Sequence, residues 1–281
     1  MKIIIPAAGY GKRFADAGYN MLKPLIEVDK KPIIEHVTNM FPGESDFIFV
    51  CNENHLKTTN IKDIITRLSG KIVAVKPHSV GPVHTVLQAS HLIDDDEPVI
   101  ICYCDFYEWW NYNHFKDTVL KNNCDAAVTA YTGFHPHLLG NNFYAGMRVK
   151  DNWMLECKEK HSFTNNKMDC FHQTGKFYFS SGRILKEFFT GTIENGISVN
   201  GEYYISLVTQ MMVEAGLKVY VYPVEHFLQW GTPKDMEEYN AWSSFFTGNG
   251  EKPSDNIQTF SYWNSFFRKC QWHPYGKGEN S

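Results

Sequence analysis

The first residues of the chain combine an apolar run, a glycine loop and cations. Residues 3–5 are three isoleucines, and they lead into a small-residue loop that contains Gly9 and Gly11. A short buried strand that opens into a glycine loop lets backbone N–H groups approach an anion closely. Beyond the loop, Arg13 offers a planar fork to phosphate oxygens, and Lys23 offers a point charge. The pattern predicts a cradle for a nucleoside triphosphate.

Other kinds of glycine loop fit these residues less well. The dinucleotide-binding fingerprint requires a third small residue where Phe14 stands. A Walker A loop requires Ser or Thr directly after its lysine, whereas Lys12 is followed by Arg13. An ordinary strand-to-helix turn remains an alternative for the glycine pair alone. The residues expected to bind the triphosphate are Ala7, Ala8, Gly9, Gly11 and Lys12.

An acidic residue follows a second apolar run. Residues 99–104 read as a buried strand, so Asp105 falls at the carboxyl end of that strand. In open α/β sheets, ligands bind in the crevice outside those ends. A carboxylate there suits Mg²⁺, which takes hard oxygen ligands and keeps several waters. A helix N-cap is the alternative role for Asp105.

These motifs together carry a family resemblance. The segment Pro6-Ala-Ala-Gly-Tyr-Gly-Lys-Arg-Phe, followed by Lys23-Pro24 before an apolar strand, resembles the signature of the sugar-phosphate nucleotidyltransferases. This family comprises nucleotide-sugar pyrophosphorylases and their cytidylyltransferase relatives, and the similarity continues to about residue 240. The resemblance implies catalytic roles for Arg13, Lys23 and Asp105, with Mg²⁺ as the cofactor and Asp105 as its ligand.

A second glycine loop resembles the family's nucleobase contact. Residues 77–89 partly keep the family's Gly-Thr-Ala core and open a predicted helix. The resemblance implies that Gly81 and Thr85 contact the base of the triphosphate. A Gly-Pro pair before a helix is equally an ordinary helix start, so both interpretations stay open.

Later motifs resemble the family's acceptor site. Glu159-Lys160 precedes Thr174-Gly-Lys-Phe-Tyr-Phe, and in the family the lysine of this pair meets the sugar phosphate while the glutamate meets the sugar. Glu202 stands where a family glutamate faces the acceptor sugar, although an acid near a helix start also suits the helix dipole. The resemblance implies an acceptor site formed by Tyr144, Gly146, Glu159, Lys160, Gly175 and Glu202.

One position departs from the family pattern. Residues 229–235 resemble the family's Asp-x-Gly-Thr-Pro-x-Asp turn, but Gln229 stands where the family usually places the aspartate that is its second metal ligand. An amide oxygen is a neutral and weaker ligand than a carboxylate. Either Asp105, phosphates and water hold the metal, or the second ligand comes from elsewhere in the chain.

Alternating strands and helices must position these residues. The expected strands are residues 2–5, 47–51, 72–75, 98–103 and 126–131, and the expected helices are residues 32–40, 56–68 and 83–93. The turn-like pair Asp151-Asn152 predicts a hairpin between residues 143–149 and 153–158. This alternation predicts an α/β fold with a mostly parallel, Rossmann-like open sheet and helices on both faces. The resemblance implies the nucleotidyltransferase or glycosyltransferase A-type version of that fold, with a small acceptor-binding β subregion.

We expect one nucleotidyltransferase domain over residues 1–246, with an NTP-binding half over about 1–132 and an acceptor-binding half over about 133–246. Residues 247–281 read as a linker followed by an aromatic C-terminal extension. The run of large aromatic residues over 260–275 predicts a surface that packs onto the parent domain or onto a sister subunit. A homo-oligomer is therefore left open.

Composition narrows the class of protein. A net charge of −4 over 281 residues gives no support for binding to nucleic acid or to an anionic membrane. Seven cysteines without a Cys-x-x-Cys pair argue against a disulfide framework. No apolar stretch reaches the roughly 18 residues of a membrane span, and the first residues are too short for a signal peptide. We expect a protein of the reducing cytoplasm.

The expected reaction joins a nucleoside triphosphate to a phosphorylated small-molecule acceptor and releases pyrophosphate. The product would be an activated NDP- or CMP-linked precursor for surface polysaccharide or related biosynthesis. The residues of the first glycine loop favour cytidylyl transfer. A glycosyltransferase of the same fold is an alternative, but Asp105-Phe-Tyr-Glu lacks the Asp-x-Asp that such enzymes commonly show. A non-catalytic nucleotide sensor is a second alternative, motivated by Gln229.

Overall fold

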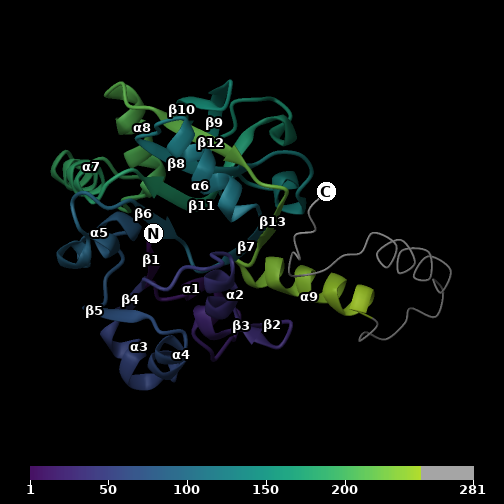
Figure 1. The fold of residues 1–281 in the computed structure, drawn as a ribbon. Helices are drawn as coiled ribbons and strands as arrows, with labels where there is room; N and C mark the ends of the chain where they lie inside the picture. Colours follow the sequence, from purple (N-terminus) through teal and green to yellow (C-terminus); the bar gives the residue numbers. More distant parts are fainter. Residues whose placement is uncertain (248–281) are drawn as a thin grey trace, which may run out of the picture. The chain divides into compact units, whose positions relative to one another are not determined.

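A nine-stranded sheet forms the centre of the structure (Figure 1). The computed structural model describes residues 1–247, and its contacts divide the chain into Met1–Gly231 and a second unit that begins at Thr232. The strands of this sheet are β1 (Lys2–Ala7), β4 (Phe47–Asn52), β5 (Lys71–Val75), β6 (Val99–Cys102), β8 (Ala126–Tyr131), β9 (Gly146–Lys150), β10 (Trp153–Lys158), β11 (Phe171–Phe179) and β12 (Val219–Pro223). Their order in space is β5-β4-β1-β6-β11-β8-β12-β10-β9.

Most of the sheet is parallel, as the sequence predicts. Strands β5, β4, β1 and β6 run parallel to one another, and β12 runs parallel to β8. Strand β11 lies antiparallel between β6 and β8 and also pairs with β9, and β10 is antiparallel to β12 and β9. The predicted α/β class is confirmed, and the antiparallel β11 is the feature that joins the two parallel groups.

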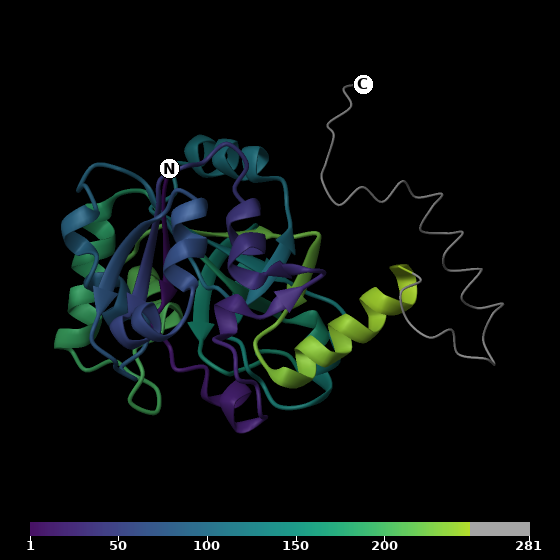
Figure 2. The ribbon, with the colours of Figure 1, turned by 90° about the horizontal axis from the view of Figure 1, so that it is seen from below.

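Helices flank the sheet on both sides, which also confirms the prediction (Figure 2). In the first unit they are α1 (Lys12–Asp16), α2 (Ile33–Asn39), α3 (Glu53–Thr58), α4 (Ile61–Arg67), α5 (Pro82–Leu87), α6 (Tyr112–Lys121), α7 (Gly182–Glu194) and α8 (Ile205–Glu214). Two short ribbons lie outside the sheet, namely β2 (Glu27–Val28) with β3 (Lys31–Pro32), and β7 (Phe106–Trp109) with β13 (His226–Gln229).

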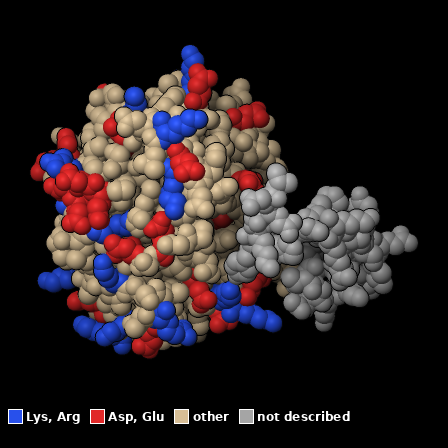
Figure 3. Space-filling model, in the orientation of Figure 1, with Lys and Arg blue, Asp and Glu red and all other residues tan. Residues whose placement is uncertain are grey.

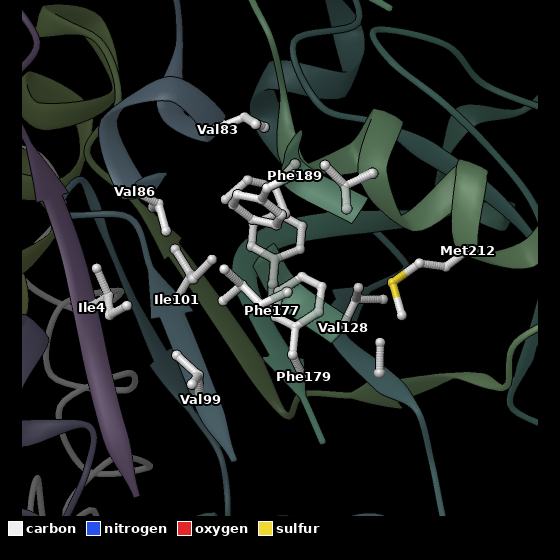
Figure 4. Close-up of a cluster of buried hydrophobic side chains, with 14 of the residues drawn as sticks. Ile4, Val83, Val86, Val99, Ile101, Val128, Phe177, Phe179, Phe189 and Met212 are labelled. Carbon is white, nitrogen blue, oxygen red and sulfur yellow. The ribbon is translucent and has the colours of Figure 1, made fainter. Parts of the chain in front are cut away.

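Side chains of β11 alternate between the two faces of the sheet, as the period of two for a strand requires. Phe179 packs edge-to-face on Phe189 of α7, with ring centroids 5.4 Å apart, and belongs to the buried cluster drawn in Figure 4. Tyr178 faces the opposite side, where it contacts Phe115 of α6 at 6.0 Å. Each fully buried Phe or Leu contributes roughly 1.5–3 kcal/mol to folding, so the sheet is held from both faces.

The predicted hairpin is present. Strands β9 and β10 pair antiparallel from Lys150 opposite Trp153. The two turn residues have positive φ, 52° at Asp151 and 63° at Asn152, which is the conformation of the two-residue turns that suit the strand twist. Short polar residues occupy such positions most easily after glycine, so the sequence signal had a direct physical basis.

One predicted helix is divided. The expected helix over residues 56–68 forms as α3 and α4, because Thr59 is extended with φ −132° and ψ 169°. The Thr59 hydroxyl donates to the His55 carbonyl at 2.8 Å and is 3.4 Å from the Ile61 N–H. Threonine and asparagine compete for helical hydrogen bonds in this way. The predicted helix over 83–93 is also shorter, since α5 ends at Leu87.

The second unit begins with α9 (Pro233–Thr247). The Asp235 carboxylate accepts hydrogen bonds from the Thr232 backbone N–H at 3.0 Å and from its hydroxyl at 2.7 Å. The Thr232 hydroxyl in turn accepts from the Asp235 N–H at 3.2 Å. This reciprocal cap, with Pro233 in the first turn, confirms the predicted helix start. The predicted linker and aromatic extension fall almost entirely outside the described residues.

The surface carries charges of both signs. Basic and acidic side chains are interspersed over the face shown in Figure 3, in keeping with the small net charge of −4. Within residues 1–247, none of the helices combines the length and the apolar character needed to cross a bilayer.

Candidate functional site

The glycine loop leaves the carboxyl end of β1, near the middle of the sheet. Ala7 and Ala8 are buried, whereas Gly9 and Lys12 are exposed. Gly11 has a left-handed φ of 61° and precedes α1, so glycine suits this turn. The predicted cradle residues therefore lie along one loop, with small buried side chains beneath it and exposed backbone above it.

The structure brings Lys23 and Asp105 together. The Lys23 ammonium lies 2.8 Å from the Asp105 carboxylate and donates to the Gly231 carbonyl at 3.1 Å. The exposed fractions of the two side chains are 16% and 34%, so both atoms remain within reach of a ligand. Two buried residues, Pro24 and Leu25, follow Lys23 in the short 3₁₀ turn Lys23–Leu25. Their burial fixes the backbone from which the Lys23 side chain extends.

Gln229 lies at the same end of the β7–β13 ribbon as Asp105. It stands opposite Phe106 in the antiparallel register, and the Trp230 N–H donates to the Asp105 carbonyl at 2.8 Å. The Gln229 side chain lies near His137, where it raises the pKa of that imidazole against the stronger effect of burial. Burial lowers the pKa of His137 to about 3, so this imidazole is neutral at physiological pH.

The donor set fits a Mg²⁺ ion that arrives with a triphosphate. Among residues 1–247, no three or more His, Cys, Asp or Glu side chains gather in a way that could hold a metal by themselves. Asp105 supplies one carboxylate, and Gln229 offers a neutral amide in place of a second one. Because Mg²⁺ commonly binds through one or two carboxylates plus substrate phosphates and water, Asp105 is sufficient for such an ion.

Arg13 reaches from α1 toward residues of the predicted acceptor half. Its guanidinium is exposed and lies 5.9 Å from the centre of the Phe143 ring. Its charge also acts on Tyr204, whose pKa it lowers against the stronger effect of burial. The structure thus places Arg13 between the cradle and the acceptor motifs.

Two predicted acceptor residues, Lys160 and Glu202, contact Tyr204 just before α8, and a third, Glu159, contacts Ser206 in the first turn of that helix. The Lys160 ammonium donates to the Tyr204 hydroxyl at 3.2 Å, and Glu202 hydrogen-bonds to the same tyrosine. The Glu159 carboxylate accepts a hydrogen bond from Ser206. Burial raises the pKa of Glu159, and the charge of Glu202 adds to that effect, while Ser206 and Lys160 oppose it. Sequence analysis missed Tyr204 and Ser206, although they lie only two and four residues after Glu202 in the chain.

The second glycine loop is held by the same segment. Gly81 has φ 106°, and a Cβ atom there would lie 2.6 Å from the Tyr203 nitrogen. The Tyr203 N–H donates to the Val80 carbonyl at 2.8 Å. Thr85 is buried, and its hydroxyl lies 3.1 Å from the Gly81 carbonyl and 3.3 Å from His78. Gly81 therefore has a packing role, and the half-buried His78 is more exposed than Thr85.

Two further glycines at predicted acceptor positions also permit close approaches. Gly175 has φ 126°, and a Cβ atom there would lie 2.8 Å from the Phe106 ring. A Cβ atom at Gly146 would lie 2.3 Å from the His161 carbonyl. Both glycines are buried, so the structure gives each a packing role and leaves their contact with an acceptor as a prediction.

Tyr144 belongs to a group of rings that sequence analysis did not identify, which we call the histidine cluster and which comprises Tyr131, His135, His137, Tyr144, His172 and Phe227. The Tyr131 hydroxyl is 2.6 Å from His137 Nε2. Burial lowers the pKa of His135 to about 4. The cluster is therefore neutral at physiological pH, and its His137 lies near Gln229.

Comparison with known proteins relates the chain to one family. A model of the MobA-like NTP transferase domain matches residues 3–159. The bifunctional protein GlmU of Latilactobacillus sakei subsp. sakei (strain 23K) is 25% identical over 235 residues, which cover 80% of this chain and 46% of that protein. GlmU of Burkholderia ambifaria (strain MC40-6) is 25% identical over 224 residues, with 78% and 46% covered. The chain spans about half the length of the curated relatives it matches.

Solved structures share the fold. The nucleoside-diphosphate-sugar pyrophosphorylase from Vibrio cholerae RC9 has a TM-score of 0.70 at 18% identity, over 85% of this chain and 99% of that chain. The inositol-1-phosphate CTP transferase from T. maritima has a TM-score of 0.66 at 16% identity, over 86% and 94%. A UDP-glucose pyrophosphorylase complexed with UDP-glucose has a TM-score of 0.67 at 17% identity, over 86% and 98%.

Proposed function

Because the chain belongs to the family of MobA-like NTP transferase domains, we propose that it is a nucleotidyltransferase that joins a nucleoside triphosphate to a phosphorylated small molecule. A phosphate oxygen of the acceptor attacks the α-phosphorus, and pyrophosphate leaves in line. The observation that carries this proposal is the pair of Lys23 and Asp105, 2.8 Å apart beside an exposed glycine loop. A cation and a carboxylate in contact there suit a metal–triphosphate ligand.

Positioning and charge stabilisation are the main contributions of the protein to such a reaction. Arg13 would bind the leaving pyrophosphate, and Lys23 would bridge toward the α-phosphoryl group. Asp105 would hold Mg²⁺, which supplies a positive charge against the phosphate oxygens. Because Asp105 and Lys23 contact each other already, both are directed to one point before substrate binds.

The acceptor would bind near Tyr204. Lys160 is the cation available to its phosphate, and Glu159 and Glu202 are acceptors for hydroxyl groups. Such a group of one lysine and two acids suits a polyhydroxylated phosphate, for example a sugar or polyol phosphate. We propose a division into an NTP-binding half up to about residue 132 and an acceptor-binding half after it.

Two finer proposals concern the product. We propose cytidylyl transfer, on the basis of the residues of the first glycine loop. The inositol-1-phosphate CTP transferase of T. maritima is one protein of the same fold whose name states this chemistry. The resulting CMP- or NDP-linked compound would serve surface polysaccharide or related biosynthesis in the cytoplasm.

The decisive experiment measures pyrophosphate release. The purified chain is incubated with each of four NTPs, Mg²⁺ and a panel of sugar and polyol phosphates, and the Asp105→Asn variant is the matched control. We expect release with one favoured NTP that depends on both the acceptor and Asp105. A glycosyltransferase would release no pyrophosphate from NTP, and absence of release with every pair would refute the proposal.

A nucleotide sensor is the second candidate, because Gln229 is a neutral amide and adds no carboxylate to the proposed metal site. A sensor would bind NTP with Mg²⁺ in a calorimeter yet release no pyrophosphate with any acceptor. Turnover at any substantial rate excludes it.

A further inference from the structure

Two charged side chains lie in the interior of the first unit, outside the residues assigned above. Lys176 is on β11 and Glu108 is on β7, and the ammonium lies 2.7 Å from the carboxylate. The exposed fractions of the side chains are 2% and 0%. Lysine and glutamate are almost never fully buried without a partner, so this ion pair calls for a role.

Two hydroxyl groups and an aromatic ring lie around the pair. The Glu108 carboxylate accepts a hydrogen bond from the Thr129 hydroxyl at 2.9 Å, which is itself 2.5 Å from the Thr174 hydroxyl. The Lys176 ammonium lies 3.4 Å from the centre of the Trp110 ring. Burial lowers the pKa of Lys176, and the charge of Glu108 opposes this. The pair is thus enclosed by hydroxyls on one side and an aromatic face on the other.

Lys176 contacts both ends of the segment that carries Asp105, one end through strand pairing and the other through its ammonium group. In the sheet register, Lys176 stands opposite Cys102, the last residue of β6. The adjacent Gly175 carbonyl accepts a hydrogen bond from the Tyr103 N–H at 3.0 Å. From Cys102 the chain continues through Asp105 into β7, where Glu108 returns to the Lys176 ammonium. Asp105 therefore lies midway in a segment that is fixed at each end by one residue.

We propose that the buried pair of Lys176 and Glu108 is a positioning device for the metal-binding carboxylate, which fixes the segment from Cys102 to Glu108 and so holds Asp105 toward Lys23. This inference rests on the proposed role of Asp105 in the function above. Buried ion pairs add little net stability compared with apolar residues of similar volume, but their geometry is exacting. A positioning role therefore predicts that removal of the pair misaligns Asp105 while it changes the free energy of unfolding little.

The test uses a double variant, Lys176→Met with Glu108→Leu, which removes both charges and leaves no unpaired one. Ile65→Val, in α4, is the control for a small change in a different part of the core. We expect the double variant to fold, with faster hydrogen exchange over residues 103–109 and unchanged exchange in α7. Misplacement by about 1 Å can cost about 10²-fold in rate, so kcat should fall by roughly that factor while the half-saturating Mg²⁺ concentration rises.

A second variant keeps the test decisive if the double variant does not fold. Glu108→Gln keeps the volume and the hydrogen bond from Thr129, and Lys176 can become neutral beside the amide because burial already lowers its pKa. We expect the same direction of change in exchange and in Mg²⁺ dependence. Wild-type exchange and wild-type half-saturating Mg²⁺ in a folded variant would overturn the inference.

A binding measurement separates this inference from the proposed function. Mn²⁺ binding in the presence of a non-hydrolysable NTP analogue is followed by electron paramagnetic resonance, without turnover. If the unmodified protein releases no pyrophosphate but the variants bind Mn²⁺ more weakly and exchange faster over 103–109, the proposed function fails and the positioning role stands. If instead the unmodified protein is active and the variants match it in hydrogen exchange over residues 103–109, in half-saturating Mg²⁺ and in Mn²⁺ binding, only the positioning role fails.

Discussion

The replacement Gln229→Asp tests how the metal is held. Gln229 lies at the end of β13, opposite Phe106 and next to the residue that bonds to the Asp105 backbone. The substitution adds a carboxylate at the end of β13, opposite the residue that follows Asp105. We expect Mg²⁺ to bind the nucleotide-free variant at least about tenfold more tightly, or by about 1.4 kcal/mol.

The same carboxylate has a competing partner in His137. Burial and the neighbouring His135 lower the pKa of His137 to about 3. A carboxylate within about 4 Å of the ring would favour the imidazolium by about 4 kcal/mol at an effective dielectric constant of about 20, which raises the pKa of His137 toward the physiological range. Below that pKa the imidazolium would hold the carboxylate, and above it the carboxylate would be available to the metal. The gain in Mg²⁺ affinity should therefore be larger at pH 7.5 than at pH 5.5.

Calorimetric titration of Mg²⁺ into the nucleotide-free proteins at the two pH values measures the effect. Gln229→Asn is the matched control, because it shortens the side chain in the same way without adding charge. Equal Mg²⁺ affinities for the Asp and Asn variants would show that position 229 does not face the metal. Tight stoichiometric binding by the unmodified protein would refute the view that the ion enters with the triphosphate.

Four further predictions concern other parts of the site. Asp105→Asn should lower kcat by about 10³-fold at saturating Mg²⁺, and a near-normal kcat would remove Asp105 from the mechanism. Lys160→Met should raise KM mainly for the acceptor and Lys23→Met mainly for the NTP, so steady-state kinetics showing the reverse would contradict both assignments. Burial raises the pKa of Glu159, so the native state keeps that proton to higher pH than the unfolded chain, and stability falls as pH rises between the two values; urea unfolding of Glu159→Gln should show a smaller loss between pH 4 and pH 7. Gly81→Ala should lower Tm by several degrees, roughly 1–3 kcal/mol, because it strains a positive φ, and an unchanged Tm would mean that the loop moves freely away from its neighbour.

The sequence was informative where local physics decides the structure. The apolar runs predicted β1, β4 and β6, and the rule that ligands bind outside strand ends predicted that Asp105 would lie near the glycine loop. The contact between Asp105 and Lys23 agrees with that expectation. Apolar periodicity and turn chemistry act over a few residues, so a single sequence contains them completely.

The sequence was uninformative where distant segments meet. Nothing near Gln229 in the sequence indicates that its side chain lies near His137, because the two residues are far apart in the chain. Lys176 and Glu108 look like ordinary charged positions of amphipathic strands, and only the folded arrangement shows that both are buried. Tyr204 gave a local signal through its neighbour Glu202, but its role as a common partner of Lys160 and Glu202 needs the fold.

Strand β11 shows how the two predicted halves are connected. Its carboxyl half, from Lys176 to Phe179, pairs with β6 of the NTP-binding half, while Phe171 and His172 at its amino end pair with β9 of the acceptor-binding half. The register of β11 with β8 shifts between Gln173 and Phe177, around Gly175 and its positive φ. Because β11 is antiparallel, its amino half extends past the carboxyl end of β6, which is the edge where Asp105 lies. One strand thus links the metal-binding segment to the acceptor half, and a change at Gly175 should disturb both substrates together.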